Sequence, residues 1–214
     1  MSTNYSTQAK GGLLTRQKEP YQFMMWLGLA GSSLIFITLI AISFIRRESL
    51  GWTEISMPGA FWLSSLLIFS SSVTLFEAVL AFRTERFRHY RICLALTFIL
   101  GVIFTITQSV GWLELFEMAE SVSNKSSLSF VYLITGLHFL HILGGLGFLG
   151  ILLTEALRNT TYIDAFVYSV NGPNLIRIRL LSIYWHFIGG LWLALFFMML
   201  FLLLPSAHHT TVTI

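Results

Sequence analysis

Five ionisable side chains stand inside long apolar runs of the sequence, where burial of a charge in lipid is costly and a functional role is the first hypothesis. They are Glu77, His138, His141, Glu155 and His186. The first two histidines are three residues apart, so they share one face of a helix, and this spacing invites metal binding. A closed site needs three or four ligands, and no Cys or acidic residue stands at a matching depth. The sequence therefore predicts no metal site in this chain.

We expect the three histidines to be buried, neutral and hydrogen-bonded to polar groups across helices. The candidate partners are Thr105, Thr107 and Gln108 in the preceding apolar run and Thr135 in the run that holds the histidine pair.

The two acids stand nearer the ends of their runs than the histidines do. We expect Glu155, close to Arg158, to pair with a basic residue at the membrane surface. Glu77 has two interpretations. Pairing with Arg83 is one, and a proton-relay role or a contact with another subunit is the other.

The composition places these residues in a membrane protein. Of 214 residues, 55% are hydrophobic and only 11% are charged, whereas a soluble domain carries about 25% charged residues. Soluble enzymes and nucleic-acid-binding proteins are excluded. The single Cys93 also excludes a disulfide framework, and no phosphate-binding loop or catalytic triad is recognisable.

Five apolar windows are long enough to cross a bilayer core, which takes about 20 helical residues. The predicted spans are 23–45, 59–82, 92–113, 128–153 and 181–204. Residues 1–22 form a polar amino-terminal segment and residues 205–214 a short tail. Between the last two spans, residues 162–170 are expected at the interface and residues 171–174 in a turn. The predicted fold is an all-α bundle of five transmembrane helices.

Basic residues are concentrated in the amino-terminal segment and in the second and fourth connections, while the other connections are mainly acidic. The main basic residues of these two connections are Arg83, Arg86, Arg88, Arg91, Arg158, Arg177 and Arg179. By the positive-inside rule, the amino terminus is cytoplasmic and the carboxyl terminus is outside.

Small residues mark faces where helices can approach closely in lipid. The fourth span carries Gly136, Gly144, Gly145, Gly147 and Gly150, which we assign to the chain's own core. We assign a second set, in the first two spans, to packing against another subunit: Gly28, Gly31, Ser32, Ser71 and Ser72.

Three segments resemble subunit III of the haem–copper terminal oxidases, the cytochrome c and quinol oxidases of respiratory chains. They are Thr135-Gly136-Leu137-His138-Phe139-Leu140-His141, then Tyr184-Trp185-His186-Phe187 followed by Trp192, and Leu100-Gly101-Val102 with Phe104, Thr105 and Gln108. The resemblance covers about residues 23–204.

The resemblance implies a five-helix form of a fold that has seven helices in other members, in a bacterial plasma (inner) membrane. It implies a buried polar core of Thr105, Gln108, Thr135, Gly136, His138, His141, Tyr184, Trp185, His186 and Trp192. It further implies a subunit that binds no haem or copper, holds phospholipid, and assembles with a haem–copper subunit I and a subunit II. Cytochrome c or quinol then supplies electrons to a proton-pumping complex.

Departures from the family pattern leave alternatives open. Ser32 stands where the family has a buried Glu, and Gly189 where it often has an Asp. A subunit-III-like accessory protein of a nitric oxide reductase is one alternative. A stand-alone small-solute transporter is another, but internal repeats or interrupted helices around a midplane site would be expected of it.

Overall fold

The computed structural model describes residues 20–46, 57–120, 126–159, 161–170 and 172–203. Over these ranges the chain forms six helices and no strand: α1 (Pro20–Ile45), α2 (Gly59–Arg83), α3 (Phe87–Glu120), α4 (Ser126–Arg158), α5 (Tyr162–Val170) and α6 (Gly172–Leu203). All but α5 are long and apolar enough to cross a membrane. The predicted five-span all-α fold is confirmed, while the predicted boundaries of the polar terminal segments lie largely outside the described residues.

The helices extend beyond the predicted apolar windows. α3 begins five residues earlier than the expected start at 92, and α6 begins at Gly172 instead of 181. The predicted turn at 171–174 is therefore wrong for its described part, because Gly172, Pro173 and Asn174 form the first turn of α6. A proline is tolerated there, since the first helical N–H groups have no partner within the helix. The expected interfacial segment is the short helix α5.

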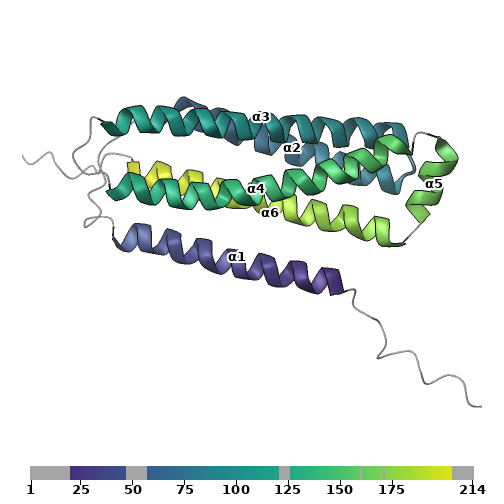
Figure 1. Ribbon diagram of the computed structural model, residues 1–214, viewed down its shortest axis with the longest axis horizontal. Helices are drawn as coiled ribbons and strands as arrows, with labels where there is room; N and C mark the ends of the chain where they lie inside the picture. Colours follow the sequence, from purple (N-terminus) through teal and green to yellow (C-terminus); the bar gives the residue numbers. More distant parts are fainter. Residues whose placement is uncertain (1–19, 47–56, 121–125, 160, 171, 204–214) are drawn as a thin grey trace, which may run out of the picture.

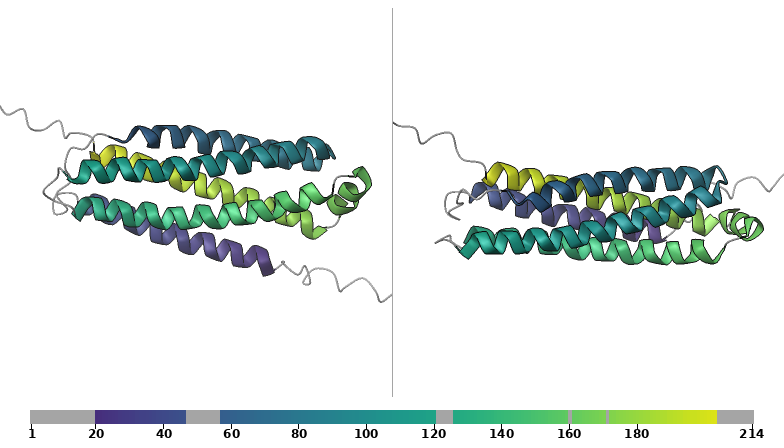
Figure 2. Two further views of the ribbon diagram at one scale, coloured as in Figure 1. Left: turned by 45° about the horizontal axis from the view of Figure 1, so that its top comes forward. Right: turned by 90° about the horizontal axis from the view of Figure 1, so that it is seen from above.

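Helices α2, α3, α4 and α6 form the body of the bundle, α1 lies along its outside, and α5 crosses one end (Figure 1). Two further views show the same arrangement, with α1 running beside α4 and α6 (Figure 2). The α2–α3 turn, the end of α4 and the start of α6 all lie at the end that carries α5. The two basic connections therefore meet at one end of the bundle, as five consecutive spans require.

A tight turn joins α2 to α3. The N–H of Arg86 donates to the carbonyl of Ala81 at 2.9 Å, and the N–H of Glu85 donates to that of Phe82 at 3.3 Å. This is a Schellman motif, in which the residue after the helix adopts the left-handed conformation. That residue is Glu85, with φ of 57°. The motif ends α2 sharply, and α3 then returns antiparallel against it.

Candidate functional site

Two tryptophans of α6 hydrogen-bond to serines of α2 in the middle of the bundle. Trp185 Nε1 donates to Ser71 Oγ at 2.9 Å, and Trp192 Nε1 donates to Ser65 Oγ at 3.0 Å. Both indoles are buried, so an unpaired N–H would carry a desolvation cost. These bonds join α6 to α2 where lipid supplies no hydrophobic drive for helix association.

The same bonds correct the assignment of Ser71 and Ser72 to a partner-facing surface. Ser71 is buried within the chain, and Ser72 Oγ lies 3.5 Å from where a Cβ on Gly189 would stand. Both serines therefore face α6. Gly28 and Gly31 have no atom within 4 Å of the equivalent position, and their contact with another subunit stays a prediction.

Further polar pairs join α3 to its neighbours. Gln108 Nε2 donates to Ser64 Oγ at 3.1 Å, and Trp112 Nε1 donates to Thr135 Oγ1 at 3.1 Å. The predicted bonds from Gln108 and Thr135 to the histidines are therefore wrong. Thr105 and Thr107 instead donate to carbonyls one turn earlier in α3.

His138 lies in the core without a hydrogen bond. Neither ring nitrogen has a partner, although both are buried. The imidazole stacks on the indole of Trp192, with ring centroids 5.9 Å apart, and meets the ring of Phe36 edge-on. Its surroundings are thus aromatic, which contradicts the expected bond across helices.

His141 makes the bond across helices that was expected, but with a different helix. Its Nδ1 lies 2.8 Å from the carbonyl of Leu137, which can only accept, so Nδ1 carries the proton. Nε2 then accepts from the hydroxyl of Ser32 on α1, at 3.0 Å. Ser32 therefore contacts the chain's own histidine, and its assignment to a subunit-facing surface stays a prediction. Tyr184 Oη donates to the carbonyl of His141 at 3.1 Å and joins α6 to the same point.

His186 is not buried, contrary to expectation. Its side chain is exposed on α6, and Nδ1 donates to the carbonyl of Ser182 at 2.6 Å. The adjacent Trp185 faces the core instead, because neighbouring residues on a helix point in different directions.

Close helix contacts depend on other glycines than Gly136. A Cβ on Gly101 would stand 2.8 Å from the Trp185 ring, and one on Gly111 would overlap the Phe61 ring. Gly145 is nearly as tight, against Ile188 at 3.0 Å. Gly136 has no such neighbour within 4 Å, so its expected packing role is wrong.

Glu155 forms the ion pair that was predicted, with Arg177. Two charge-assisted bonds of 2.8 Å join the carboxylate to the guanidinium, and Tyr168 Oη donates to the same carboxylate at 2.7 Å. Burial and then the bond to Glu155 raise the pKa of Tyr168 above its usual range, so the phenol stays a donor at neutral pH. The cluster joins α4, α5 and α6 at one end of the bundle.

Glu77 lies exposed on α2 and makes no ion pair with Arg83 or with any other residue in the described ranges. Pairing with Arg83 is therefore not the explanation for this acid. The interpretation as a contact to another subunit or a proton group stays a prediction.

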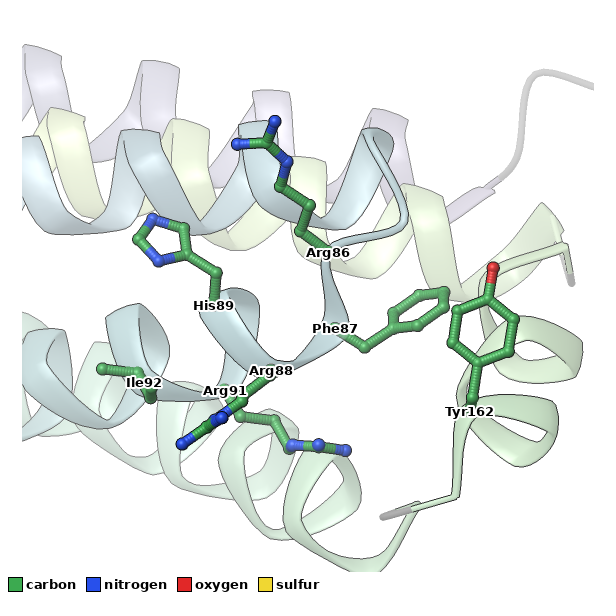
Figure 3. A pocket seen from close by; sticks show the side chains of 7 residues that line it. All are labelled: Arg86, Phe87, Arg88, His89, Arg91, Ile92 and Tyr162. Carbon is green, nitrogen blue, oxygen red and sulfur yellow. The ribbon is translucent and has the colours of Figure 1, made fainter.

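A surface pocket of about 470 Å³ opens at the start of α3, beside α5 (Figure 3). The side chains of Arg88 and Arg91 extend to one side of α3, and those of Arg86 and His89 to the other (Figure 3). Arg91 Nη1 donates to the carbonyl of Asn159 at 2.9 Å. Phe87 packs edge-on against Tyr162, with ring centroids 5.5 Å apart. These contacts fix α5 and the end of α4 against α3.

The described residues contain no group of three or more His, Cys, Asp or Glu side chains placed to hold a metal ion. What they do contain is a multi-pass helical bundle whose spans are joined by buried indole, hydroxyl and amide groups. This arrangement defines a polytopic membrane protein.

The sequence of this chain also matches a known protein family. The family model of cytochrome c oxidase subunit III matches residues 32–203. The chain belongs to this family, the subunit III family of haem–copper terminal oxidases, and is a multi-pass membrane protein.

Individual relatives are distant but cover most of the chain. A probable cytochrome c oxidase subunit 3 from Mycobacterium tuberculosis (strain ATCC 25618 / H37Rv) is 28% identical over 185 residues, 84% of this chain and 85% of the relative. A cytochrome c oxidase subunit 3 from Bacillus sp. (strain PS3) is 22% identical over 175 residues, 80% of each. A cytochrome bo(3) ubiquinol oxidase subunit 3 from Buchnera aphidicola subsp. Acyrthosiphon pisum (strain APS) is 25% identical over 180 residues, 81% of this chain and 82% of the relative.

Proposed function

We propose that this chain is a non-catalytic subunit that stabilises the haem–copper subunit of a proton-pumping terminal oxidase. Haem and copper are held by the partner subunits I and II, and electrons come from cytochrome c or quinol. The proposed location is a bacterial plasma membrane, with the amino terminus inside and phospholipid around the helices.

The observation that carries the proposal is how the chain uses its polar side chains inside the spans. Trp185, Trp192, Gln108 and Trp112 each donate to a hydroxyl on another helix. These groups hold the helices together and leave a rigid surface for a neighbouring subunit. They support a structural role, for which the bundle needs a fixed shape and no reacting group.

A structural subunit can affect catalysis through the geometry and hydration of its partner's site. Each 1.4 kcal/mol of barrier is about tenfold in rate, so a small loss of preorganisation in the partner is readily measured. The basic end of this bundle, with Arg88 and Arg91, would lie on the proton-uptake side if the proposed orientation holds.

The experiment compares the oxidase from cells that have this chain with the oxidase from cells that lack it. We expect unchanged haem per catalytic subunit, but a lower yield and a shorter active lifetime without the chain. Loss of haem in proportion to the missing chain would contradict a non-catalytic role. Effects confined to a nitric oxide reductase would select the accessory-protein alternative.

Glu77 gives a second test, because it is exposed at membrane depth without a partner among the described residues. We expect Glu77→Gln to change turnover of the assembled complex or its pH profile. Ser70→Ala is the matched control, since Ser70 is a half-buried residue of α2 that bonds only to its own helix. Unaltered turnover across pH in Glu77→Gln would contradict a role of Glu77 as a proton group or a subunit contact.

A further inference from the structure

His186 stands near the middle of a membrane span and faces away from the chain. The span covers Asn174–Leu202, and His186 is exposed within it. The depth is supported by the neighbouring residue, because Trp185 packs against Gly101 near the centre of α3. A polar side chain at this depth normally faces the bundle interior.

The hydrogen bond of His186 fixes which of its atoms lacks a partner. Nδ1 lies 2.6 Å from the carbonyl of Ser182, and since a carbonyl only accepts, the proton is on Nδ1. In the neutral ring Nε2 is then an acceptor. No described residue donates a hydrogen bond to it. An unpaired acceptor in a medium without water costs free energy, so this atom is poised for a donor from outside the chain.

The surface around His186 allows close approach of another helix. Gly190, one turn further along α6, is exposed, and a Cβ there would meet nothing within 4 Å. The adjacent Gly189 is different, because it packs against Ile68 and Ser72 of α2. The exposed stripe continues through Leu193 to Phe197, which borders a groove that Ile40 and Phe44 of α1 also line. Gly189 thus packs inside the bundle, whereas Gly190 lies on the exposed face beside the unpaired imidazole of His186.

We infer that the stripe formed by His186, Gly190, Leu193 and Phe197 is the docking surface for a transmembrane helix of the haem–copper catalytic subunit. That helix presents a hydroxyl, amide or indole donor to Nε2 of His186. Lipid is the other possible neighbour of a surface at this depth, but acyl chains carry no hydrogen-bond donor. The inference rests on the proposed function, since it names the contact of that assembly.

The outward stripe of α3 provides a contrast. Its exposed residues Ile99, Ile103 and Ile106 are aliphatic, as expected for a surface that faces acyl chains. Ile106 therefore serves as the matched control for α6.

The first test places a photoreactive benzoylphenylalanine at position 193 or at position 106 of the full tagged chain in its native membrane. We expect a covalent adduct with the catalytic subunit from position 193, and mainly lipid adducts from position 106. If position 193 gave only lipid adducts, or adducts with a second copy of this chain, in a preparation that contains the catalytic subunit, the inference would be overturned.

The second test measures haem retained per tagged chain during mild-detergent purification. Interhelical hydrogen bonds in membrane proteins correspond to roughly 3-fold effects on association, rising to about 20-fold. We expect a loss in this range for His186→Leu and partial recovery for His186→Gln, whose amide oxygen can accept. Ile106→Ala should retain haem fully.

The outcomes distinguish failure of the docking surface from failure of the proposed function. Equal haem retention by the wild-type chain and by His186→Leu would contradict the docking surface alone. A wild-type chain that retained no haem-bearing partner would contradict the proposed function itself. The thermal midpoint of each variant chain is measured in parallel, and because His186 is exposed, we expect it to be unchanged.

Discussion

Helices α1 and α6 are both apolar spans, yet they are attached to the bundle in different ways. Half of the residues in the most apolar stretch of α6 are buried in the protein, against 17% for α1. α6 contacts α2 and α4 along its length and bonds to both, through Trp185, Trp192 and Tyr184. α1 contacts its neighbours along one stripe, with Phe36 against the histidines and Ser32 on His141.

Apolar character alone is not what attaches a helix to a bundle surrounded by lipid. An exposed leucine or phenylalanine gains about as much from contact with acyl chains as from contact with another helix. Close packing at small residues and hydrogen bonds between helices provide the specific attachment. By this measure α6 is the central element and α1 the least firmly attached span.

The largest effect is expected from removing the main anchor of α6. Trp185→Ala deletes a buried indole and leaves a cavity, so we expect the free energy of unfolding in detergent to fall by about 3–5 kcal/mol. Trp26→Ala is the control on α1, where the indole is exposed. Similar losses in the two variants would show that α1 and α6 are attached alike.

A smaller effect is expected from added bulk at the α3–α6 contact. A methyl group on Gly101 would stand 2.8 Å from the Trp185 ring and 2.9 Å from Leu146. We expect Gly101→Ala to destabilise the chain by about 1–3 kcal/mol. Gly136→Ala, with open space at its Cβ, should change stability little. Thermal unfolding of both variants measures the difference, and an equally damaging Gly136→Ala would contradict the packing described.

The ion pair at the basic end should contribute less. Glu155 and Arg177 are each about one-third exposed, so solvent weakens their attraction. A double-mutant cycle with Glu155→Gln and Arg177→Gln is expected to give a coupling energy of about 1 kcal/mol, reduced at high salt. Zero coupling at low salt would mean that α4 and α6 are held together by their other contacts.

The smallest effect concerns α1. Ser32→Ala removes the hydroxyl that donates to His141 and should cost about 0.6 kcal/mol, the average for such bonds in a membrane. SDS titration with Ser71→Ala as the comparison gives the two values under the same conditions. Ser71→Ala should cost more, because it leaves the buried Trp185 N–H unpaired.

Much of this fold could be predicted from the sequence, because a helix that crosses a bilayer needs a long run of apolar residues. Apolar run length gave the five spans, and their alternation across the membrane predicted which connections share an end. Helix ends were less predictable, since a helix continues past the hydrocarbon core until something stops it. Gly172 and Pro173 suggested a turn, but both fit the first turn of α6.

The partners of the polar groups were harder to predict, because they depend on helix rotation. His138 and His141 share a face, yet one lies among aromatic rings and the other bonds to α1. His186 was expected inside, but Trp185 occupies the inward position. The sequence does hold one usable signal: Trp185 and Trp192 are seven residues apart, so both lie on one face of α6, and Ser65 and Ser71 line the facing helix at almost the same spacing.

If this chain works as a subunit of a haem–copper oxidase, it should purify together with its haem-bearing partners. The most direct measurement is purification of the tagged chain from its native membrane in mild detergent, followed by an optical redox spectrum and oxygen consumption with cytochrome c or quinol. The account predicts haem-bearing partners and donor-dependent oxygen consumption. A chain that purifies alone, or with a nitric oxide reductase, would contradict it.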